Sequence, residues 1–436
     1  MPTDNPPLPL NPSVLGPCPR EVDKENHLRL LSCFEESWPQ VAIVRLYWFD
    51  FGATEQHYDV TMDQFRAMIE NATSMWIGET PYYSPDSPKT KLWQRDVDAD
   101  QIPVNFHAIP DCESLKPSPA SPAYAYCYCY WVDDYPKGPD GPNPCQELEV
   151  RGIAVSSLCP RGRLRLAEMA ALDISLKLLV GIEFDFAVIR PNHKHLPTHG
   201  PDSKALYEPG SEPWKVNYSD VEELLERMGK RLEDHKIWIR NWDPVGRGGR
   251  INLKLDPRPP RVACDVFVFA RDSIHAMCEA EGWDLTLLTH PEKLSDIFKL
   301  HISLHHEDDP FHIAYTDGCK NEHFLAGMLE HLPALVALGK STPMSYIRSD
   351  WTKPYKGQYA SWGTGNKDAT IRGVEPHHWE FSPVDALCPL PLVCAGLIHA
   401  GLDGVKQEKR PKYQDTRCTL TFQHSPPSSF LDMANS

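Results

Sequence analysis

Long apolar runs and paired cysteines are what this sequence lacks. No stretch approaches the roughly 18 uncharged apolar residues that a transmembrane helix needs, and residues 1–7 lack the basic and apolar regions of a secretion signal. The 13 cysteines include no CxxC pair, so they indicate neither a disulfide framework nor a zinc site. We therefore expect a cytoplasmic protein that has no membrane partner.

Positive charge is also scarce. The 44 basic residues face 60 acidic ones, which gives a net charge of -16 and argues against nucleic acid as a partner. Solubility is the simpler explanation of this acidity, and a small molecule is the expected partner. At 436 residues the chain exceeds the roughly 250 to 300 residues at which single hydrophobic cores stop growing. Two domains are therefore expected.

Changes in composition divide the chain into five segments. Proline crowds the N-terminus and the stretch after position 133, where regular structure is not expected. Segments with few apolar residues cannot offset their ordering entropy. The predicted segments are a mobile tail over residues 1–26, an N-terminal domain over 27–135, a linker over 136–158, a second domain over 159–424 and a tail over 425–436.

Apolar periodicity predicts the main helices and strands. The strands are expected over residues 41–50 and 57–61, which form a hairpin, and over 123–132 and 181–189. The helices are expected over residues 62–71, 163–179, 221–234, 263–281, 324–338 and 391–401. Cys127 and Cys129 alternate with tyrosines on one of these strands, which favours core thiols and buried aromatics over an aromatic binding strip.

Two acidic residues mark the strand over 181–189 as a candidate site. Glu183 and Asp185 lie two positions apart, so both carboxylates project from one face while Phe184 turns to the other. An acidic pair on a strand is more often a solvated face. The apolar neighbours Ile182 and Phe186 favour a buried functional pair that needs cations close by.

Four motifs carry a resemblance to a known family. Residues 181–186 read Gly-Ile-Glu-Phe-Asp-Phe, residues 345–348 read Ser-Tyr-Ile-Arg, and the stretches 321–338 and 360–372 complete the set. Together they resemble the catalytic domain of glutamine synthetases, with the Trp362-Gly363 context closest to divergent fungal members. The resemblance implies an α+β fold in which a small N-terminal β-grasp-like domain precedes a large antiparallel sheet backed by helices. It also implies a homo-oligomer of stacked rings.

The same resemblance implies a degraded metal site. Glu183, Asp185 and Glu380 match metal-binding acids of the family, with Asp185 shortened from glutamate. Lys299 stands where the family has a ligating histidine, and a protonated lysine has no lone pair for a metal. His301 keeps the second histidine, which in the family lies near the nucleotide phosphates.

Substrate contacts are implied at five further positions. Arg250 replaces a glutamine and Asn252 a second glutamate, while Lys367 replaces an arginine. The full set implied for the substrate is Arg250, Asn252, Arg348, Lys367 and Arg372. The flap stretch 351–357 contains no acid where the family has a glutamate.

These replacements suggest a hypothesis about charge. An isolated buried carboxylate would cost several kcal/mol, about 3 to 5, so a fold that lost its metals needs compensation. Lys299 and Arg250 would supply it, in a charge-paired pocket with weak or no binding of divalent metal.

Three functions stay open from the sequence. A repurposed enzyme would use Lys299, His301 and Glu183 as acid–base groups in ring-closing or C–N chemistry on a small carboxylate, amine or peptide. An ATP-dependent amide ligase would keep ATP and one Mg²⁺ as cofactors, although no cofactor is firmly expected. An inert ring-forming scaffold or regulator belongs to a third class.

Overall fold

The chain folds around two sheets. The computed structural model describes residues 21–22, 24–49, 55–78, 106–119, 121–133, 148–150, 153–156, 158–189, 218–245, 250–287, 298–306, 318–340, 345–346 and 360–417. The structure does not describe residues 1–20 of the predicted N-terminal tail or any of the predicted C-terminal tail, 425–436. Arg348 and the flap stretch 351–357 also lie outside the described residues.

The N-terminal sheet has the strand order β3-β2-β7-β5-β4, with β6 paired to β7. Its strands β2 and β7 run parallel, and the remaining pairs are antiparallel. The strands are β2 (Ile43–Phe49), β3 (Glu55–Thr61), β4 (Met75–Gly78), β5 (Phe106–Pro110), β6 (Lys116–Pro117) and β7 (Tyr124–Asp133). The β2–β3 pairing confirms the predicted hairpin.

Two helices, α1 (Lys24–Ser37) and α2 (Met62–Glu70), and a 3-10 turn, η5 (Cys112–Ser114), accompany this sheet. Thr61 and Gln64 form a capping box that fixes the start of α2. The predicted mobile tail was too long at its C-terminal end, because β1 (Glu21–Val22) pairs with β8 (Glu149–Val150) and α1 begins at Lys24. Strand β8 also pairs with β9 (Ile153–Ala154), so the predicted linker contains two short strands.

Strand β7 is buried on both faces. Tyr126, Tyr128 and Tyr130 pack toward one side, and Cys127 and Cys129 toward the other, with none more than 6% exposed. The prediction of core thiols and buried aromatics is confirmed.

The large sheet has the strand order β11-β12-β10-β14-β17-β16-β15 in the described part of the chain, and β13 also pairs with β10. All pairs are antiparallel except β15 with β16. The strands are β10 (Leu176–Ile189), β11 (Ile239–Val245), β12 (Arg250–Leu255), β13 (Asp284–Thr286), β14 (Phe298–His306), β15 (Trp362–Thr364), β16 (Ile371–Glu375) and β17 (His378–Phe381). The α+β architecture expected from the sequence is confirmed.

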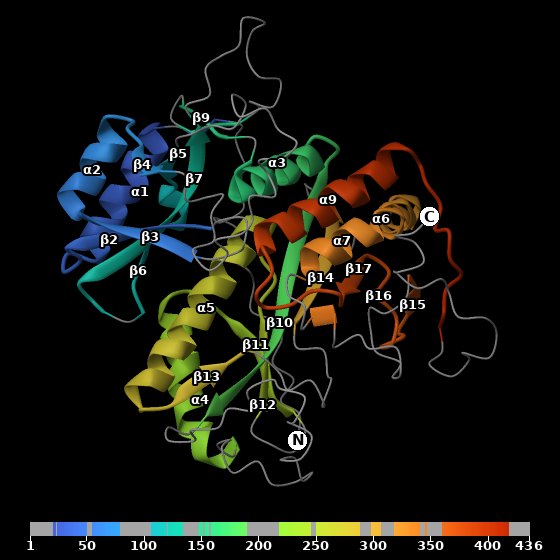
Figure 1. Ribbon diagram of the computed structural model, residues 1–436. Helices are drawn as coiled ribbons and strands as arrows, with labels where there is room; N and C mark the ends of the chain where they lie inside the picture. The colour runs from blue at the N-terminus through green and yellow to red at the C-terminus, as the bar shows by residue number, and fades with distance from the viewer. Residues whose placement is uncertain are drawn as a thin grey trace, which may run out of the picture.

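Helices cover one face of this sheet, as Figure 1 shows for α3, α5 and α9 beside the green strand β10. They are α3 (Pro160–Leu172), α4 (Tyr218–Asp234), α5 (Pro260–Ala280), α6 (Gly318–Glu330), α7 (Leu332–Gly339) and α9 (Leu390–Lys406). Phe184 on β10 meets Phe267 of α5 edge to face at 5.2 Å, which places this apolar face under the helices. The acids at positions 183 and 185 therefore face away from them.

Two predicted helices were wrong in extent. The helix predicted over residues 163–179 ends at Leu172, because Ser175 has a positive φ of 58° and β10 starts at Leu176. The helix predicted over 324–338 is two helices that break at His331, because Pro333 cannot donate the hydrogen bond a continuous helix requires. Continuous apolar sequence hid both boundaries.

Helices α6 and α9 cross at unusually close range. A side chain at Gly327 would place its Cβ 1.9 Å from the carbonyl oxygen of Ala400, so only glycine fits there. This crossing holds α9, which in turn packs on α3.

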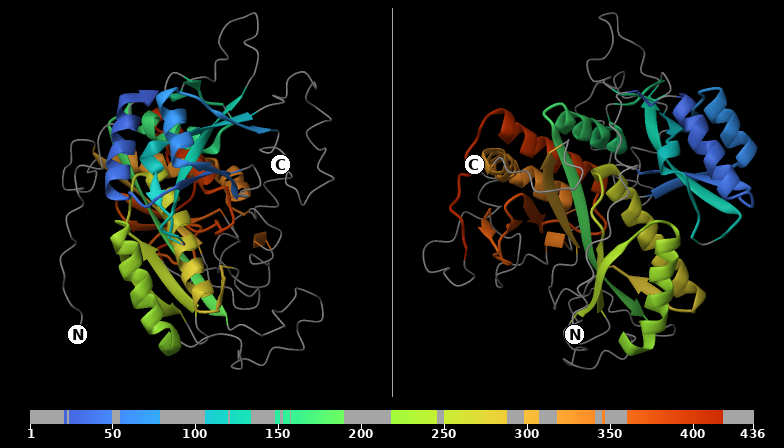
Figure 2. Two further views of the ribbon diagram at one scale, coloured as in Figure 1. Left: turned by 90° about the vertical axis from the view of Figure 1, so that its left-hand side faces the viewer. Right: turned by 180° about the vertical axis from the view of Figure 1, so that it is seen from behind.

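A buried ion-pair network joins the two domains, which lie against each other at α3 and α5 (Figure 2). We call it the joint network: Asp111 and Glu113 from the N-terminal domain with Arg161, Arg261 and Asp265 from the second domain. Asp111 Oδ2 accepts from Arg161 Nη2 and from Arg261 Nη1, each at 2.7 Å. Arg161 also pairs with Asp265, and Arg261 with Glu113. Burial alone would raise the pKa of Asp111, but Arg261 and Arg161 hold it well below its usual range.

None of the described helices is long and apolar enough to cross a membrane.

Candidate functional site on the polar face of the large sheet

Strand register gathers the charged residues that the sequence singled out. Glu183 on β10 lies opposite Lys299 on β14, and Asp185 lies opposite Asn252 on β12. His301 on β14 lies opposite Glu380 on β17. Because facing residues in a sheet project from the same side, all six side chains share the face that the helices leave uncovered. We call this surface the polar face.

Glu183 is the centre of this face. Its Oε1 accepts a hydrogen bond from Lys299 Nζ at 2.6 Å, and its Oε2 lies 3.5 Å from His301 Nε2. Burial would raise the pKa of Glu183, yet the hydrogen bond from His301 and the charge of Lys299 hold it below its ordinary value. The carboxylate is therefore ionised and tied to a fixed ammonium group.

Asn252 ties the two acids of β10 together. Its amide nitrogen donates to Glu183 Oε1 at 3.1 Å and to Asp185 Oδ1 at 2.6 Å. Asp185 is 2% exposed and Asn252 is 7% exposed. An amide that donates to both acids takes the position between them that a cation would otherwise have.

Glu380 is paired from the neighbouring strand. Arg372 on β16 lies opposite it and donates from Nη1 to Glu380 Oε2 at 2.9 Å. Ser382 Oγ lies 3.5 Å from Glu380 Oε1. Arg372 Nε is buried and makes no hydrogen bond within the described residues, which leaves one guanidinium donor for a ligand.

His378 is a member of the site that sequence reasoning missed. Its Nε2 lies 2.9 Å from His301 Nδ1. Burial lowers the pKa of His378 to about 4, and nearby His301 adds to the effect, so the ring is neutral near pH 7. The two imidazole rings therefore share one hydrogen bond, whose direction depends on their tautomers, while His301 Nε2 faces Glu183. The adjacent pair His377-His378 was the available signal, but only the β14–β17 register reveals the contact.

Three predicted substrate residues remain, and only one of them, Lys367, has a described side chain. Arg250 lies on β12 opposite Ala187, but its side chain is outside the described part of the structure. Arg348 lies outside it altogether. Lys367 is exposed on the loop after β15. The amide of Asn366 beside it is engaged by the backbone and hydroxyl of Thr416.

Glu183, Asp185 and Glu380 do not fit a pair of divalent cations as they stand. A metal needs carboxylate lone pairs, and Lys299, Asn252 and Arg372 direct N–H groups at these oxygens instead. The described part of the chain has a single group of three ligand atoms within 4.8 Å of one another, and it lies elsewhere: Glu330, His331 and Asp403.

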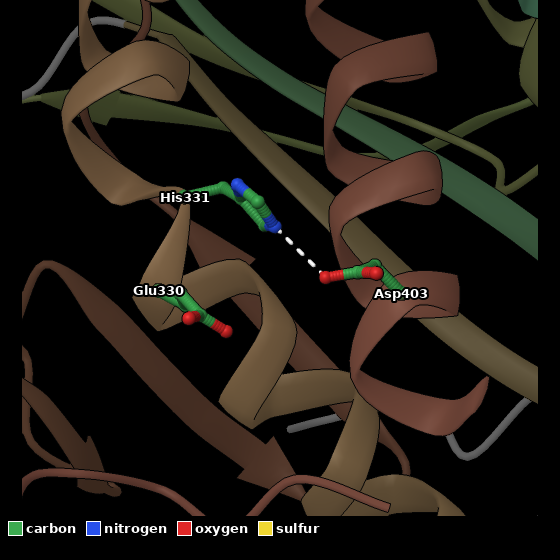
Figure 3. A group of neighbouring side chains, drawn as sticks. All are labelled: Glu330, His331 and Asp403. Atoms are coloured by element: carbon green, nitrogen blue, oxygen red, sulfur yellow. Dashed lines mark hydrogen bonds and ion pairs between the residues drawn. The ribbon is translucent and has the colours of Figure 1, made fainter. Parts of the chain in front are cut away.

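That second group lies between α6 and α9, with His331 directed at Asp403 (Figure 3). Lys409 Nζ contacts Asp403 Oδ2 at 2.6 Å and also pairs with Glu330. Since an ammonium group already joins the two acids, this is a surface ion-pair cluster and not a metal site.

A cavity of about 60 Å³ lies at the domain joint, on the helix side of the large sheet. Phe49, Trp131, Cys159 and Cys264 are among its lining residues. Its charged wall residues, Arg161, Asp265 and Arg271, are all in ion pairs. Its walls are mostly apolar, and it is separate from the polar face.

Comparisons with known proteins agree with this geometry. A family described as glutamine synthetase, catalytic domain, matches residues 157–421. Protein fluG of Emericella nidulans is 24% identical over 390 residues, which cover 88% of this chain and 41% of that protein. Gamma-glutamylpolyamine synthetase GlnA3 of Streptomyces coelicolor is 28% identical over 184 residues, 38% of this chain and 39% of that protein. The matches thus span about two fifths of these relatives' length.

A solved structure described as a GmaS/ADP complex superposes with a TM-score of 0.68 at 16% identity, over 93% of this chain and 89% of that one. At that identity the likeness shows the fold alone.

Proposed function

This chain belongs to the glutamine synthetase family, and from that premise we propose that it is an enzyme of the family whose polar face has exchanged its divalent cations for fixed charged and amide groups. It acts on a small carboxylate, amine or peptide by acid–base or C–N bond-forming chemistry, including ring closure. The observation that most directly supports this proposal is the 2.6 Å hydrogen bond from Lys299 Nζ to Glu183 Oε1.

Charge balance supports a metal-independent site. Glu183 is paired with Lys299 and Glu380 with Arg372, while Asp185 accepts from an amide. Bringing a nucleoside triphosphate to this face would add several negative charges without the ions that normally offset them. A ligand of low net charge is the better match.

Arg372 supports a carboxylate as part of that ligand. Its Nε is buried without a hydrogen bond in the described residues, next to the Nη1 that holds Glu380. A buried guanidinium donor left unpaired costs free energy, and a ligand carboxylate would satisfy it.

The chain of Glu183, His301 and His378 supports acid–base chemistry. The neutral ring of His378 is hydrogen-bonded to His301, and His301 contacts the ionised Glu183. Lys299 contacts the same carboxylate of Glu183, and its side chain is 18% exposed, so its ammonium group is reachable from the open side of the sheet. A proton gained or lost at His301 would be balanced by Glu183.

A second candidate is an ATP-dependent amide ligase. It is favoured by the relative named as a gamma-glutamylpolyamine synthetase. The donors directed at Glu183 and Asp185 count against it, because a ligase would need those oxygens for metal.

Metal content and ATP hydrolysis test the choice. Purified protein is dialysed against Mg²⁺ or Mn²⁺, and bound metal is measured together with phosphate release from ATP. We expect less than one ion per subunit and no ATP hydrolysis above background. Two tightly bound ions with ATP turnover would replace our proposal by the ligase.

Lys299→His sharpens that measurement, because it restores an imidazole where the ammonium group lies. We expect the variant to bind Mn²⁺ at least tenfold more tightly than the wild type. Lys230→His, at an exposed position of α4 away from the polar face, is the matched control and should leave Mn²⁺ binding unchanged.

A further inference from the structure

The segment 413–417 runs along the outer edge of the large sheet. Trp362 on β15 donates from its indole Nε1 to the carbonyl of Tyr413 at 2.8 Å. Thr416 donates from its backbone N–H to the carbonyl of Trp362 at 3.1 Å, and its hydroxyl donates to the same carbonyl at 2.7 Å. The segment thus pairs with β15 much as an additional strand would.

Asp415 adds a second attachment. Its Oδ1 accepts from the backbone N–H of Thr364 and its Oδ2 from the Thr364 hydroxyl, both at 2.8 Å. A carboxylate that accepts from both groups of one residue fixes that residue in position and orientation.

Thr416 also holds the loop that follows β15. Asn366 Nδ2 donates to the Thr416 carbonyl at 2.7 Å and lies 3.1 Å from its hydroxyl. Asn366 Oδ1 accepts from the backbone of Asp368 at 2.9 Å, so both ends of the amide are engaged. The exposed Lys367 lies between these two anchored residues.

Gly363 shows how closely the segment is packed. A Cβ on this residue would lie 2.7 Å from Thr416 Oγ1 and 2.8 Å from the Thr416 carbonyl. Gly363 is also opposite Arg372 in the β15–β16 pair, and Arg372 is opposite Glu380. The segment is therefore two strands from a paired acid of the polar face.

We propose that residues 413–417 are a strap that orders one edge of the site, with Asp415 and Thr416 as positioning residues for β15, the Lys367 loop and Arg372. A parallel strand of three residues at a sheet edge has few hydrogen bonds of its own. The strap supplies those it lacks. Release of the strap loosens this edge without unfolding the core, and weakens the hold on a ligand at Arg372, a step that rests on the proposed function.

Hydrogen–deuterium exchange and trypsin cleavage test the ordering role in the full chain. The variants are Asp415→Ala, Thr416→Val and their combination, with Asp415→Asn as a milder form. We expect the Thr364 amide to exchange at least tenfold faster in the combined variant, and trypsin to cleave after Lys367 at least fivefold faster. Lys412→Ala, an exposed position just before the strap, is the control and should stay within twofold of wild type on both measures.

Two results would overturn the strap. One is exchange at Thr364 and cleavage at Lys367 within twofold of wild type in the combined variant. The other is an equal acceleration of amide exchange in β10 in the combined variant, which would indicate a general loss of stability. If Asp415→Asn also accelerates amide exchange equally in β15 and β10, the local role is rejected.

Binding of L-glutamate, used as the carboxylate probe, tests the positioning role by calorimetry. We expect Asp415→Ala to raise the dissociation constant at least fivefold at an unchanged melting temperature, and equal affinity would reject the positioning role. Absence of binding by the wild type would contradict both the proposed carboxylate ligand and the positioning role. The exchange measurement would still decide whether the strap orders the edge.

Discussion

The joint network and the polar face use the same chemistry for different ends. In the joint network, Asp111 is fully buried and contacts two guanidinium groups, and Arg161 and Arg261 are 9% exposed. On the polar face, Glu183 and Lys299 are 12% and 18% exposed, and the lysine contacts Glu183 through one nitrogen atom instead of a planar guanidinium group. The arginines of the joint network direct several donors at buried carboxylates, which fixes the two domains against each other. A lysine at an open face can shift or exchange its partner, which is what a binding site requires.

Aromatic rings and helix cover also distinguish the joint network from the polar face. The joint network is enclosed by aromatic rings, with Arg161 5.5 Å from the ring centres of both Tyr128 and Tyr130. The polar face has no described helix over it, and its buried donor Arg372 Nε lacks a hydrogen bond within the described residues. Buried guanidinium donors without a hydrogen bond in the described residues occur in both regions, Arg261 Nε in the joint network and Arg372 Nε on the polar face, so the difference between the regions lies in their aromatic and helix cover.

Breaking the joint network should have the largest effect on stability. Arg261→Met leaves Asp111 and Glu113 with one cation fewer in a buried setting, so we expect a loss of about 3 to 5 kcal/mol in the free energy of unfolding. Urea titration followed by tryptophan fluorescence measures it.

Arg227→Met is the matched control, because Arg227 pairs with Glu281 at 2.7 Å but both side chains are more than a third exposed. It should cost less than about 1 kcal/mol. Equal losses in the two variants would show that burial does not distinguish the joint.

Breaking the polar-face pair should cost less. Lys299→Met removes the ammonium group from Glu183 but leaves the donors of Asn252 and the nearby His301, so we expect a loss of about 1 to 3 kcal/mol at pH 7. Lys412→Met is the control, since its nitrogen lies 3.8 Å from Glu330 and its side chain is 66% exposed, and its cost should be under about 0.5 kcal/mol.

The pH dependence of the same variant sharpens the comparison. The pKa of Glu183 lies below its unfolded value, so its contribution is present above the unfolded pKa of about 4.3 and is lost as the pH falls through the folded pKa. Lys299→Met raises the folded pKa, and the variant should therefore lose less stability than wild type when the pH falls from 6 to 3. A steeper loss in the variant would contradict this account.

The sequence could predict which residues share the polar face but not which of them touch. Alternation on a strand places Glu183 and Asp185 together, since a period of two is local. The partner of Glu183 depends on the β10–β14 register, which is a long-range property. Arg372 was assigned to substrate from resemblance, yet the β16–β17 register also pairs it with Glu380.

Elements that lack an apolar period were beyond sequence reasoning. The strap residues Asp415 and Thr416 are polar, and they matter through contacts made 50 residues or more along the chain. His378 was missed for the same reason. Helix ends were misjudged where apolar residues continued into the next element, as at Leu172 and His331.

The prediction with the smallest expected effect concerns whether acid destabilises the contact between the two domains as well as the polar face. His235 stacks on Trp38 of the N-terminal domain with ring centres 5.9 Å apart and meets Phe269 at 4.9 Å. Burial, with Arg231 and Lys116 close by, lowers its pKa to about 4. The unfolded state binds the proton more tightly, so stability falls as the pH drops from about 6.5 toward 4.

His235→Phe keeps a ring at this contact and removes the titration. Because His235 is half-buried, we expect wild type to lose about 1 to 2 kcal/mol more than the variant between pH 6.5 and 4.5, measured by urea unfolding at each pH. The exposed Trp238 provides the control, because it has no ionisable group, and Trp238→Phe should follow the wild-type curve. If His235→Phe also follows that curve, the contact of His235 with Trp38 contributes nothing to the loss of stability in acid.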